Sequence, residues 1–189
     1  VPYLHALGVT DIYSSPCFRA GSGSLHGYDI VDHNSLNPEI GSEEEYEGLI
    51  AELRKYDMGQ ILDIVPNHMC ISCDGNAWWR DVLENGPASP YASYFDVDWE
   101  PVKPELRDKV LLPVLPDQYG KVLEDGGVLL GFEEGSFFVS CYGLRLPVAP
   151  ETCVLILKHR LSSLERLLSA EDPFLVELLS ITTAFSHLP

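Results

Sequence analysis

Positive charge is scarce in this sequence, which holds 12 Lys and Arg residues against 29 Asp and Glu residues. The formal net charge is therefore −17 at pH 7. A chain of this sign repels phosphate backbones and anionic lipid headgroups, so we expect neither nucleic acid nor a membrane as a partner. A neutral ligand such as a sugar remains compatible with the charge, and so does a surface that is simply well solvated.

Long apolar runs are missing as well. No stretch of about 18 consecutive apolar residues is present to span a bilayer, and the chain does not start with the basic and apolar regions of a signal peptide. We therefore expect a cytoplasmic protein. The chain begins at Val1 instead of Met, within a helix-like pattern, and we expect truncation at one or both ends.

The five cysteines are an odd number, which argues against a secreted disulfide framework and favours reduced thiols. Cys70 and Cys73 have a Cys-x-x-Cys spacing that leaves open a redox pair or half of a zinc site. A thioredoxin-like pair should open a helix, whereas the intervening Ile71 and Ser72 favour a loop. No second close pair completes a zinc site, so the sequence predicts no metal and no cofactor.

The first third of the chain alternates between helix and strand patterns. The expected elements are a helix that ends before Gly8, a strand at residues 9–14, a helix at residues 42–56 and a strand at residues 61–65. The second helix should start with a capping box, because Ser42 is followed three residues later by Glu45. The last strand is a continuous apolar run around Asp63, typical of a parallel strand buried on both faces. This pattern predicts an α/β fold with a parallel sheet.

The alternation stops after residue 68. The expected elements are then a helix at 77–85, a strand at 110–115, an antiparallel hairpin of 128–132 with 137–142, and two helices within 161–188 broken near Pro173. Such a hairpin does not belong to a pure α/β barrel. We therefore predict that residues 69–189 form an inserted α+β subdomain.

Residues 16–41 form a long, glycine-rich connection between the first predicted strand and the second helix. A loop of this length inside a compact domain is usually functional. It contains the cluster His26-Gly27-Tyr28-Asp29. Sugars are recognised by flat aromatic faces beside groups that hydrogen-bond hydroxyls. We therefore predict that Tyr28 binds substrate, with His26 as a further contact.

A second polar cluster, Asp63-Ile64-Val65-Pro66-Asn67-His68, follows the next predicted strand. The carboxyl ends of parallel strands share one edge of a sheet, where active sites lie. We expect His68 and Asn67 to bind the same sugar as Tyr28. Asp63 needs a cation or several donors in apolar surroundings. It is either a structural residue satisfied locally or a support for the site.

These two clusters resemble conserved segments of the α-amylase superfamily, glycoside hydrolase family 13. Residues 63–68 are similar to its first conserved region, and His26-Gly27-Tyr28 is similar to its tyrosine loop. The resemblance implies that residues 1–68 are the N-terminal part of an incomplete (β/α)8 TIM barrel. It also implies that Tyr28 stacks on the sugar before the cleaved bond, that His68 bonds the sugar hydroxyls, and that Asp63 braces an arginine of the next barrel strand.

Further segments resemble one branch of this superfamily, the glucosylmutases. They are residues 26–41, 78–87, 94–99, 109–113 and 142–147, so the resemblance extends over essentially the whole chain. It implies an α-glucan substrate, a maltooligosaccharide whose reducing-end α-1,4 bond becomes an α,α-1,1 bond. The implied mechanism is retaining, with a carboxylate nucleophile and a second carboxylic acid.

The family's nucleophile Asp, acid/base Glu and third Asp have no match in the sequence up to residue 189. Eight barrel units also need about 200 residues at least. We therefore expect that this chain contains none of the catalytic residues and is inactive alone. Two alternatives stay open: another α-amylase-family hydrolase or glucanotransferase, and a non-catalytic sugar-binding fragment.

Trp78 and Trp79 are adjacent on the predicted helix at 77–85. Neighbouring residues on a helix face different directions, so at most one of the two is expected to reach a sugar. Core packing explains either of them equally well.

Overall fold

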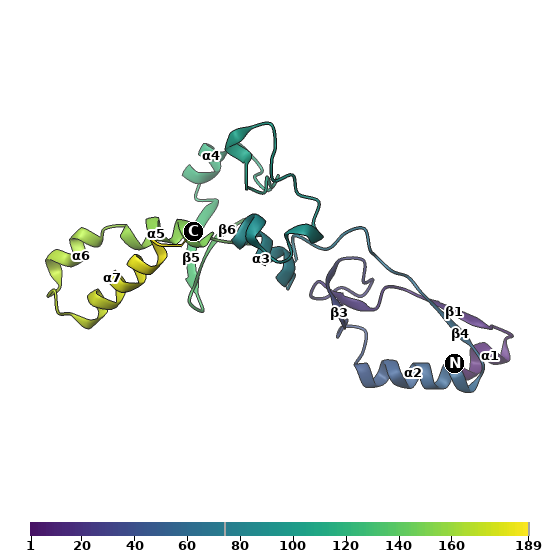
Figure 1. The fold of residues 1–189 in the computed structure, drawn as a ribbon. Helices are drawn as coiled ribbons and strands as arrows, with labels where there is room; N and C mark the ends of the chain where they lie inside the picture. Colours follow the sequence, from purple (N-terminus) through teal and green to yellow (C-terminus); the bar gives the residue numbers. More distant parts are fainter. Residues whose placement is uncertain (74, 189) are drawn as a thin grey trace. The chain divides into compact units, whose positions relative to one another are not determined.

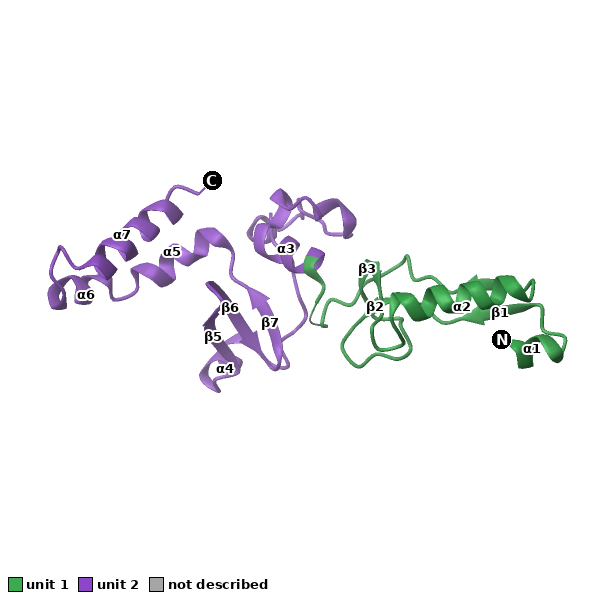
Figure 2. Ribbon diagram, turned by 90° about the horizontal axis from the view of Figure 1, so that it is seen from below, with its two compact units in different colours: residues 1–77 green, residues 78–189 purple. Residues whose placement is uncertain are grey.

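The computed structural model describes residues 1–73 and 75–188, and the chain divides into two compact units, residues 1–77 and residues 78–189 (Figures 1 and 2). The elements of the first unit are α1 (Pro2–Ala6), β1 (Asp11–Ser14), β2 (Phe18–Ala20), β3 (Ile30–Leu36), α2 (Glu43–Lys55) and β4 (Gly59–Leu62). β1 and β4 pair in parallel, from Asp11 opposite Gly59 to Ser14 opposite Leu62. The alternation of helix and strand and the parallel pairing are therefore as the sequence predicts.

Helix α2 lies beside the β1–β4 pair in both views (Figures 1 and 2) and begins with the predicted capping box. The amide of Glu45 donates to the Ser42 hydroxyl at 3.2 Å, and the Glu45 carboxylate accepts from the Ser42 amide at 2.8 Å. A cap of this kind stabilises a helix by about 1 kcal/mol. It fixes the residue at which the preceding long connection enters α2.

The strand expected at residues 61–65 is wrong in its extent and in its burial. β4 spans Gly59–Leu62, and Ile61 and Ile64 are 56% and 62% exposed. Within the described residues, β1 and β4 form a two-stranded sheet, so apolar side chains that a wider sheet would cover meet solvent. The pairing with β1 nevertheless extends one step beyond β4, because the amide of Asp63 donates to the carbonyl of Ser14 at 3.0 Å.

The connection at residues 16–41, expected as a plain loop, contains an antiparallel strand pair. β2 pairs with β3, with register shifts on both sides of Arg19. Ile30 and Val31 at the start of β3 are buried, and their β-branched side chains favour an extended backbone. The glycines in this connection suggested a loop, so the sequence did not predict the β2–β3 pair. Tyr28 and Asp29 lie directly before β3, so the pairing positions both.

The second unit contains a three-stranded sheet and several short helices. Its elements are α3 (Ala77–Asn85, which begins at the last residue of the first unit), η1 (Gly86–Ala88), η2 (Ala92–Tyr94), η3 (Pro104–Leu106), α4 (Tyr119–Glu124), β5 (Val128–Glu133), β6 (Ser136–Cys141), β7 (Leu144–Pro147), α5 (Pro150–Lys158), α6 (Leu161–Leu167) and α7 (Pro173–Phe185). The predicted helix at 77–85 is confirmed. Gly86 follows it with φ of 56°, a conformation that glycine adopts without steric cost.

The predicted hairpin is confirmed as the antiparallel pair β5–β6, and β7 adds a third strand that the sequence did not predict. Residues 110–115 form no strand, so that prediction is wrong. The break near Pro173 is confirmed, because Asp172 accepts hydrogen bonds from the amides of Phe174 and Leu175 and starts α7. Helix α5, which was not predicted, packs against α7 (Figure 2).

The compact units divide between residues 77 and 78. The boundary at residue 68 was predicted from the resemblance to the α-amylase superfamily, as the end of the partial barrel. It stays a prediction. None of the helices formed by the described residues has the length and apolarity needed to cross a bilayer.

Candidate functional site

Tyr28 and Asp63 are joined directly by their side chains. The Tyr28 hydroxyl donates to Oδ2 of Asp63 at 2.7 Å, although 35 residues separate them in the sequence. Tyr28 stands before β3, and Asp63 directly follows β4, so the hydrogen bond links the long connection to the end of the parallel pair. Tyr28 is 45% exposed, which leaves part of its ring accessible to a ligand.

The Asp63 carboxylate accepts several hydrogen bonds. The hydroxyls of Tyr28 and Tyr13 and the amide of Ile64 lower the pKa of Asp63, with Tyr28 as the largest cause. The sequence predicted that either a cation or several hydrogen-bond donors would satisfy this carboxylate. The structure shows donors. No salt bridge between Asp63 and a cation is present in the described part of the chain. Asp63 is half-buried, so the desolvation expected for a deeply buried group is small.

His68 and His26 hold the backbone of Tyr28 from two sides. Nε2 of His68 lies 3.2 Å from the carbonyl oxygen of Tyr28, and the Tyr28 amide donates to Nδ1 of His26 at 3.1 Å. The His26 and Tyr28 rings also stack, with centroids 6.0 Å apart and an interplanar angle of 20°. The structure therefore brings together three predicted site residues, Tyr28, His68 and His26, with Asp63.

Asn67, the remaining predicted contact, is exposed in a bend next to His68. Among the described residues, none is joined to its side chain by a hydrogen bond, so its amide faces the surroundings without a fixed orientation. Its place beside His68 puts it at the same edge of the parallel pair.

A network of buried polar groups anchors the loop that carries Tyr28. Ser24 donates to Asp29, and the fully buried Asn37 donates from Nδ2 to the Ser24 carbonyl at 2.8 Å. The Asn37 amide donates to the carbonyl of Cys17 at 2.8 Å, and the Gly23 amide donates to Glu39 at 2.9 Å. Reasoning from the sequence missed Asn37, Asp29 and Tyr13, because a single Asn, Asp or Tyr carries no periodic signal that marks it as a support.

Gly27 is required by the close approach of Pro16. Its φ is 77°, and a Cβ atom built there would lie 2.2 Å from the Pro16 carbonyl oxygen. Because Gly27 immediately precedes Tyr28, this contact sets the direction in which the chain enters the site. A side chain at position 27 must therefore displace either the loop or Pro16.

Gly27→Ala should destabilise the protein by at least about 2 kcal/mol, from the left-handed backbone together with the overlap. Gly23→Ala is a matched control, because Gly23 has the same φ of 77° with nothing within 4 Å of an added Cβ. We expect it to cost only about 1 kcal/mol. Urea unfolding measures the free energy of unfolding of both variants. Equal losses of this free energy would show that the close approach of Pro16 contributes nothing to the cost of the substitution.

Asp63→Asn should alter the titration of two tyrosines. Hydrogen bonding to Asp63 raises the pKa of Tyr28 and Tyr13 above the usual 10.0, whereas burial raises the pKa of Tyr46. An NMR titration of the ring signals of the nine tyrosines should show Tyr28 and Tyr13 ionising at lower pH in the variant, with Tyr46 unchanged as the internal control. An unchanged titration would contradict the pairing.

The lowered pKa of Asp63 also has a consequence for acid stability. The folded-state pKa lies below the usual 3.8, so its contribution is fully present above about pH 4 and is lost as the pH falls through the folded value. In Asp63→Asn this part of the acid sensitivity should disappear. The stability curves of the two proteins should therefore converge as the pH is lowered below about 4.

Cys70 and Cys73 form a disulfide, so the expectation of reduced thiols is wrong for this pair. Cys17, Cys141 and Cys153 are free. The bond arises because the residues between the two cysteines turn back and bring their Cα atoms to 5.5 Å, within the range that a disulfide requires. No group of three or more metal-ligating side chains occurs in the described part of the chain.

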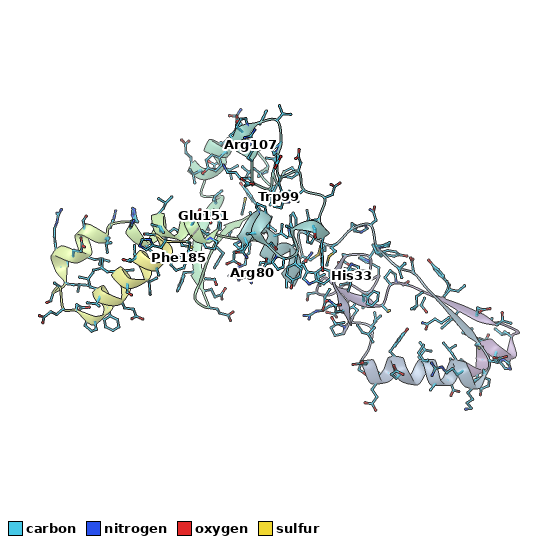
Figure 3. All side chains as sticks on the ribbon, in the orientation of Figure 1. His33, Arg80, Trp99, Arg107, Glu151 and Phe185 are labelled. Carbon is cyan, nitrogen blue, oxygen red and sulfur yellow. A yellow bond between two sulfur atoms is a disulfide. The ribbon has the colours of Figure 1, made fainter. Side chains whose placement is uncertain are left out.

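Trp78 and Trp79 face different surroundings, as predicted. Trp79 is buried and its ring centroid lies 4.9 Å from that of Phe95, whereas Trp78 stacks on Tyr91 at 5.7 Å with an interplanar angle of 16°. His33, labelled in Figure 3, lies on β3 and meets Phe18 edge-on at 6.0 Å. Trp79 belongs to the core of the second unit, whereas Trp78 and His33 pack on neighbouring aromatic rings.

The first unit also has a cavity of about 280 Å³ between the long connection and α2. Its lining includes Ser14, Cys17, Asn37, Glu45, Tyr46 and Gln60. Neither Tyr28 nor His68 lines it, so these predicted sugar-binding residues lie outside the cavity.

Known proteins similar to this chain were found by sequence and by structure. A putative maltooligosyl trehalose synthase of Mycobacterium tuberculosis is 40% identical over 153 residues, which cover 78% of this chain and 18% of the relative. The intracellular maltogenic amylase of Bacillus subtilis is 36% identical over 107 residues, covering 57% and 17%. A solved hypothetical maltooligosyl trehalose synthase of Sulfolobus tokodaii matches with a TM-score of 0.65 and 36% identity, covering 89% of this chain and 21% of that chain.

This chain therefore spans about a fifth of the length of the relatives that it matches. The structural neighbours are TIM-barrel enzymes of the amylase family, and the match lies in an N-terminal part of them. The family model for the alpha amylase catalytic domain matches residues 1–125. The chain belongs to the alpha-amylase catalytic domain family.

Proposed function

We propose that this chain is the N-terminal portion of an enzyme that converts the reducing-end α-1,4 bond of a maltooligosaccharide into an α,α-1,1 bond. The reaction is a retaining intramolecular transglycosylation, in which a carboxylate first forms a glycosyl-enzyme intermediate and the rotated glucose then captures it. Residues 1–68 form the first part of the catalytic barrel, and residues 69–189 form a subdomain inserted into it.

One observation carries the sugar-binding part of this proposal: the loop between β2 and β3 and the segment after β4 meet at Tyr28, Asp63 and His68. The Tyr28 hydroxyl is bound by Asp63, so the ring is held by its edge and its accessible face can stack on a glucose ring. Nε2 of His68 is engaged by the Tyr28 backbone, which leaves Nδ1 to hydrogen-bond a sugar hydroxyl. His26 braces Tyr28 from the other side, and Asn67 adds an amide.

Asp63 acts through other groups in this proposal. In the structure it fixes Tyr28, and in the complete barrel it also braces an arginine of the following strand. Hydrogen bonds from the Tyr28 and Tyr13 phenols and from the Ile64 amide lower the pKa of its carboxyl below the usual 3.8, and its negative charge suits both tasks. The catalytic carboxylates and the arginine belong to later strands outside this chain, which explains why we assign it binding residues and no catalytic ones.

The extent of the matches supports bond rearrangement over hydrolysis. The trehalose synthase relative aligns with 78% of the chain, whereas the maltogenic amylase aligns with 57%. An alignment over 78% of the chain must extend well into residues 69–189, the region predicted as an insertion. An insertion that closes over the site would exclude water, so that the glycosyl-enzyme is captured by glucose and not hydrolysed. We also propose a cytoplasmic location, where maltooligosaccharides would serve as the substrate without a cofactor.

The experiment that tests the proposal follows reducing ends during the reaction of the full-length enzyme with maltohexaose. Rearrangement removes one reducing end per event and leaves the molecular mass of the sugar unchanged. Hydrolysis by an ordinary amylase creates one reducing end per event and shortens the chain. A rise in reducing ends would therefore favour the hydrolase, and binding without any reaction would favour a non-catalytic protein.

A further inference from the structure

The Cys70–Cys73 disulfide lies within a few residues of His68 and has no part in the sugar-binding arrangement described above. Both cysteines are half-buried, so reagents in solvent can reach them. Cys17, Cys141 and Cys153 form no such pair. Within the first unit, the segment that contains the disulfide is placed against the loop that carries Tyr28.

Two contacts connect this segment to that loop. The Cys70 amide donates to the carbonyl of Ile30 at 2.8 Å, and Sγ of Cys73 lies 4.0 Å from Oδ2 of Asp29. Asp29 and Ile30 directly follow Tyr28. Gly21 lies at the same contact, because a Cβ built there would be 2.9 Å from both this Sγ atom and Oδ2 of Asp29. Cys73 therefore contacts two hydrogen-bonded parts of the loop that carries Tyr28.

The disulfide determines whether Cys73 stays in this position. Cys70 is tied to β3 by its own backbone, and Asn76 donates to its carbonyl at 2.9 Å, so its place does not depend on the sulfur bond. Cys73 is held beside Asp29 through the bond to Cys70. A disulfide that closes so short a loop restricts the unfolded chain little. Its reduction should therefore release Cys73 locally without unfolding the unit.

We propose that Cys70 and Cys73 form a reversible redox site that controls how tightly Tyr28 and His68 bind an α-glucan. The oxidised form keeps the Tyr28 loop and the His68 segment locked together, which lowers the cost of ordering them around a sugar. The reduced form frees Cys73 from Asp29 and binds more weakly. The identity of the ligand rests on the proposed function, whereas the redox chemistry rests on the disulfide alone.

The reductant is a dithiol. Its thiolate attacks one sulfur of the pair, breaks the bond between Cys70 and Cys73 and forms a mixed disulfide with the attacked cysteine. The second thiol of the reductant then displaces that cysteine. Two electrons and two protons pass to Cys70 and Cys73, which become thiols, and the reductant leaves as a disulfide. Close cysteine pairs of this kind in reducing compartments are usually transient or redox-sensing.

The first measurement counts thiols at this site in the full-length protein. The protein is equilibrated with dithiothreitol at different ratios of reduced to oxidised reagent, quenched with N-ethylmaleimide in denaturant, and digested with trypsin. The peptide of residues 56–80 has no internal Lys or Arg before Arg80 and contains both cysteines and no others. We expect this peptide to carry no maleimide when oxidised reagent dominates and two when reduced reagent dominates. A peptide that carries two maleimides at every ratio, or none at every ratio, would overturn the proposed redox site.

The second measurement is the KM for maltohexaose under the two extreme conditions, from initial rates followed by chromatography of the product, because the full-length enzyme converts this sugar during a binding titration. We expect KM to rise by about tenfold on reduction, within the usual range of coupling between sites. Cys70→Ser/Cys73→Ser should show the higher KM in both buffers. Cys17→Ser is the matched control, because Cys17 is a free, half-buried thiol of the same unit, and it should respond like the wild type.

Equal KM values for the oxidised and reduced wild type would overturn the coupling. An unchanged redox response in the double variant would overturn it too, because the response would then come from other cysteines. A protein that converts no maltohexaose under either condition would contradict the proposed function. The redox chemistry would in that case be upheld or overturned by the peptide masses alone.

Discussion

Tyr28→Ala in the full-length enzyme should lower kcat/KM for maltohexaose by about 100-fold, because the sugar then loses the aromatic surface that positions it. The change also removes the hydrogen bond to Asp63 at 2.7 Å and the contacts that His26 makes with the ring. Tyr28 is 45% exposed, so little core packing is lost and the protein should remain folded. Steady-state kinetics and a thermal unfolding curve on the same preparation separate the two effects.

Tyr28→Phe is the matched control for this variant. It keeps the ring face and removes only the hydroxyl that binds Asp63. We therefore expect kcat/KM to fall by about tenfold or less, because only one hydrogen bond to a charged group is removed. Wild-type turnover in a folded Tyr28→Ala enzyme would remove Tyr28 from the site. Equal losses in the two variants would instead show that the hydrogen bond, and not the ring face, is the important feature.

Residues 1–189 alone should form no α,α-1,1 bond, although they contain the proposed sugar-binding residues. Positioning of a sugar without a nucleophile and a general acid leaves the glycosidic bond intact, because both carboxylates take part in the retaining reaction. The measurement is the disappearance of reducing ends during prolonged incubation with maltohexaose, with the full-length enzyme as the positive control. Circular dichroism establishes whether the purified chain is folded. Any time-dependent loss of reducing ends above the blank would show that catalytic groups lie within this chain.

The parts of the fold that could be predicted are those governed by local sequence. The capping box at Ser42 and Glu45 and the break at Pro173 follow from backbone hydrogen bonding within a few residues. The hairpin β5–β6 turns at Glu134 and Gly135, both of which have positive φ. Such features need no knowledge of the remaining chain, so the sequence indicated them correctly.

The errors in the fold concern pairing and burial, which depend on distant residues. An apolar run such as 61–65 indicates a preference for a buried environment, but exposure of Ile61 and Ile64 depends on how many strands and helices surround it. The run at 110–115 has a strand-like composition, yet among the described residues no strand pairs with it. β2 and β3 were hidden by the glycines of the long connection, where the register shifts twice.

For the candidate site, the sequence pointed to the residues that lie together better than to the groups that support them. Tyr28 and His68 could be singled out because aromatic and imidazole side chains follow strand ends. Tyr13, Asn37 and Asp29 were missed, since their roles depend on hydrogen bonds between distant segments. The disulfide was missed for a different reason, because the odd number of cysteines favoured reduced thiols.

The most direct test of the account is a crystal structure of the full-length enzyme with a maltooligosaccharide bound. A single glucose ring should stack on the accessible face of Tyr28, with one of its hydroxyls within hydrogen-bonding distance of His68 Nδ1 and with the Tyr28–Asp63 hydrogen bond retained. A sugar bound elsewhere, with Tyr28 and His68 contacting no part of it, would contradict the account.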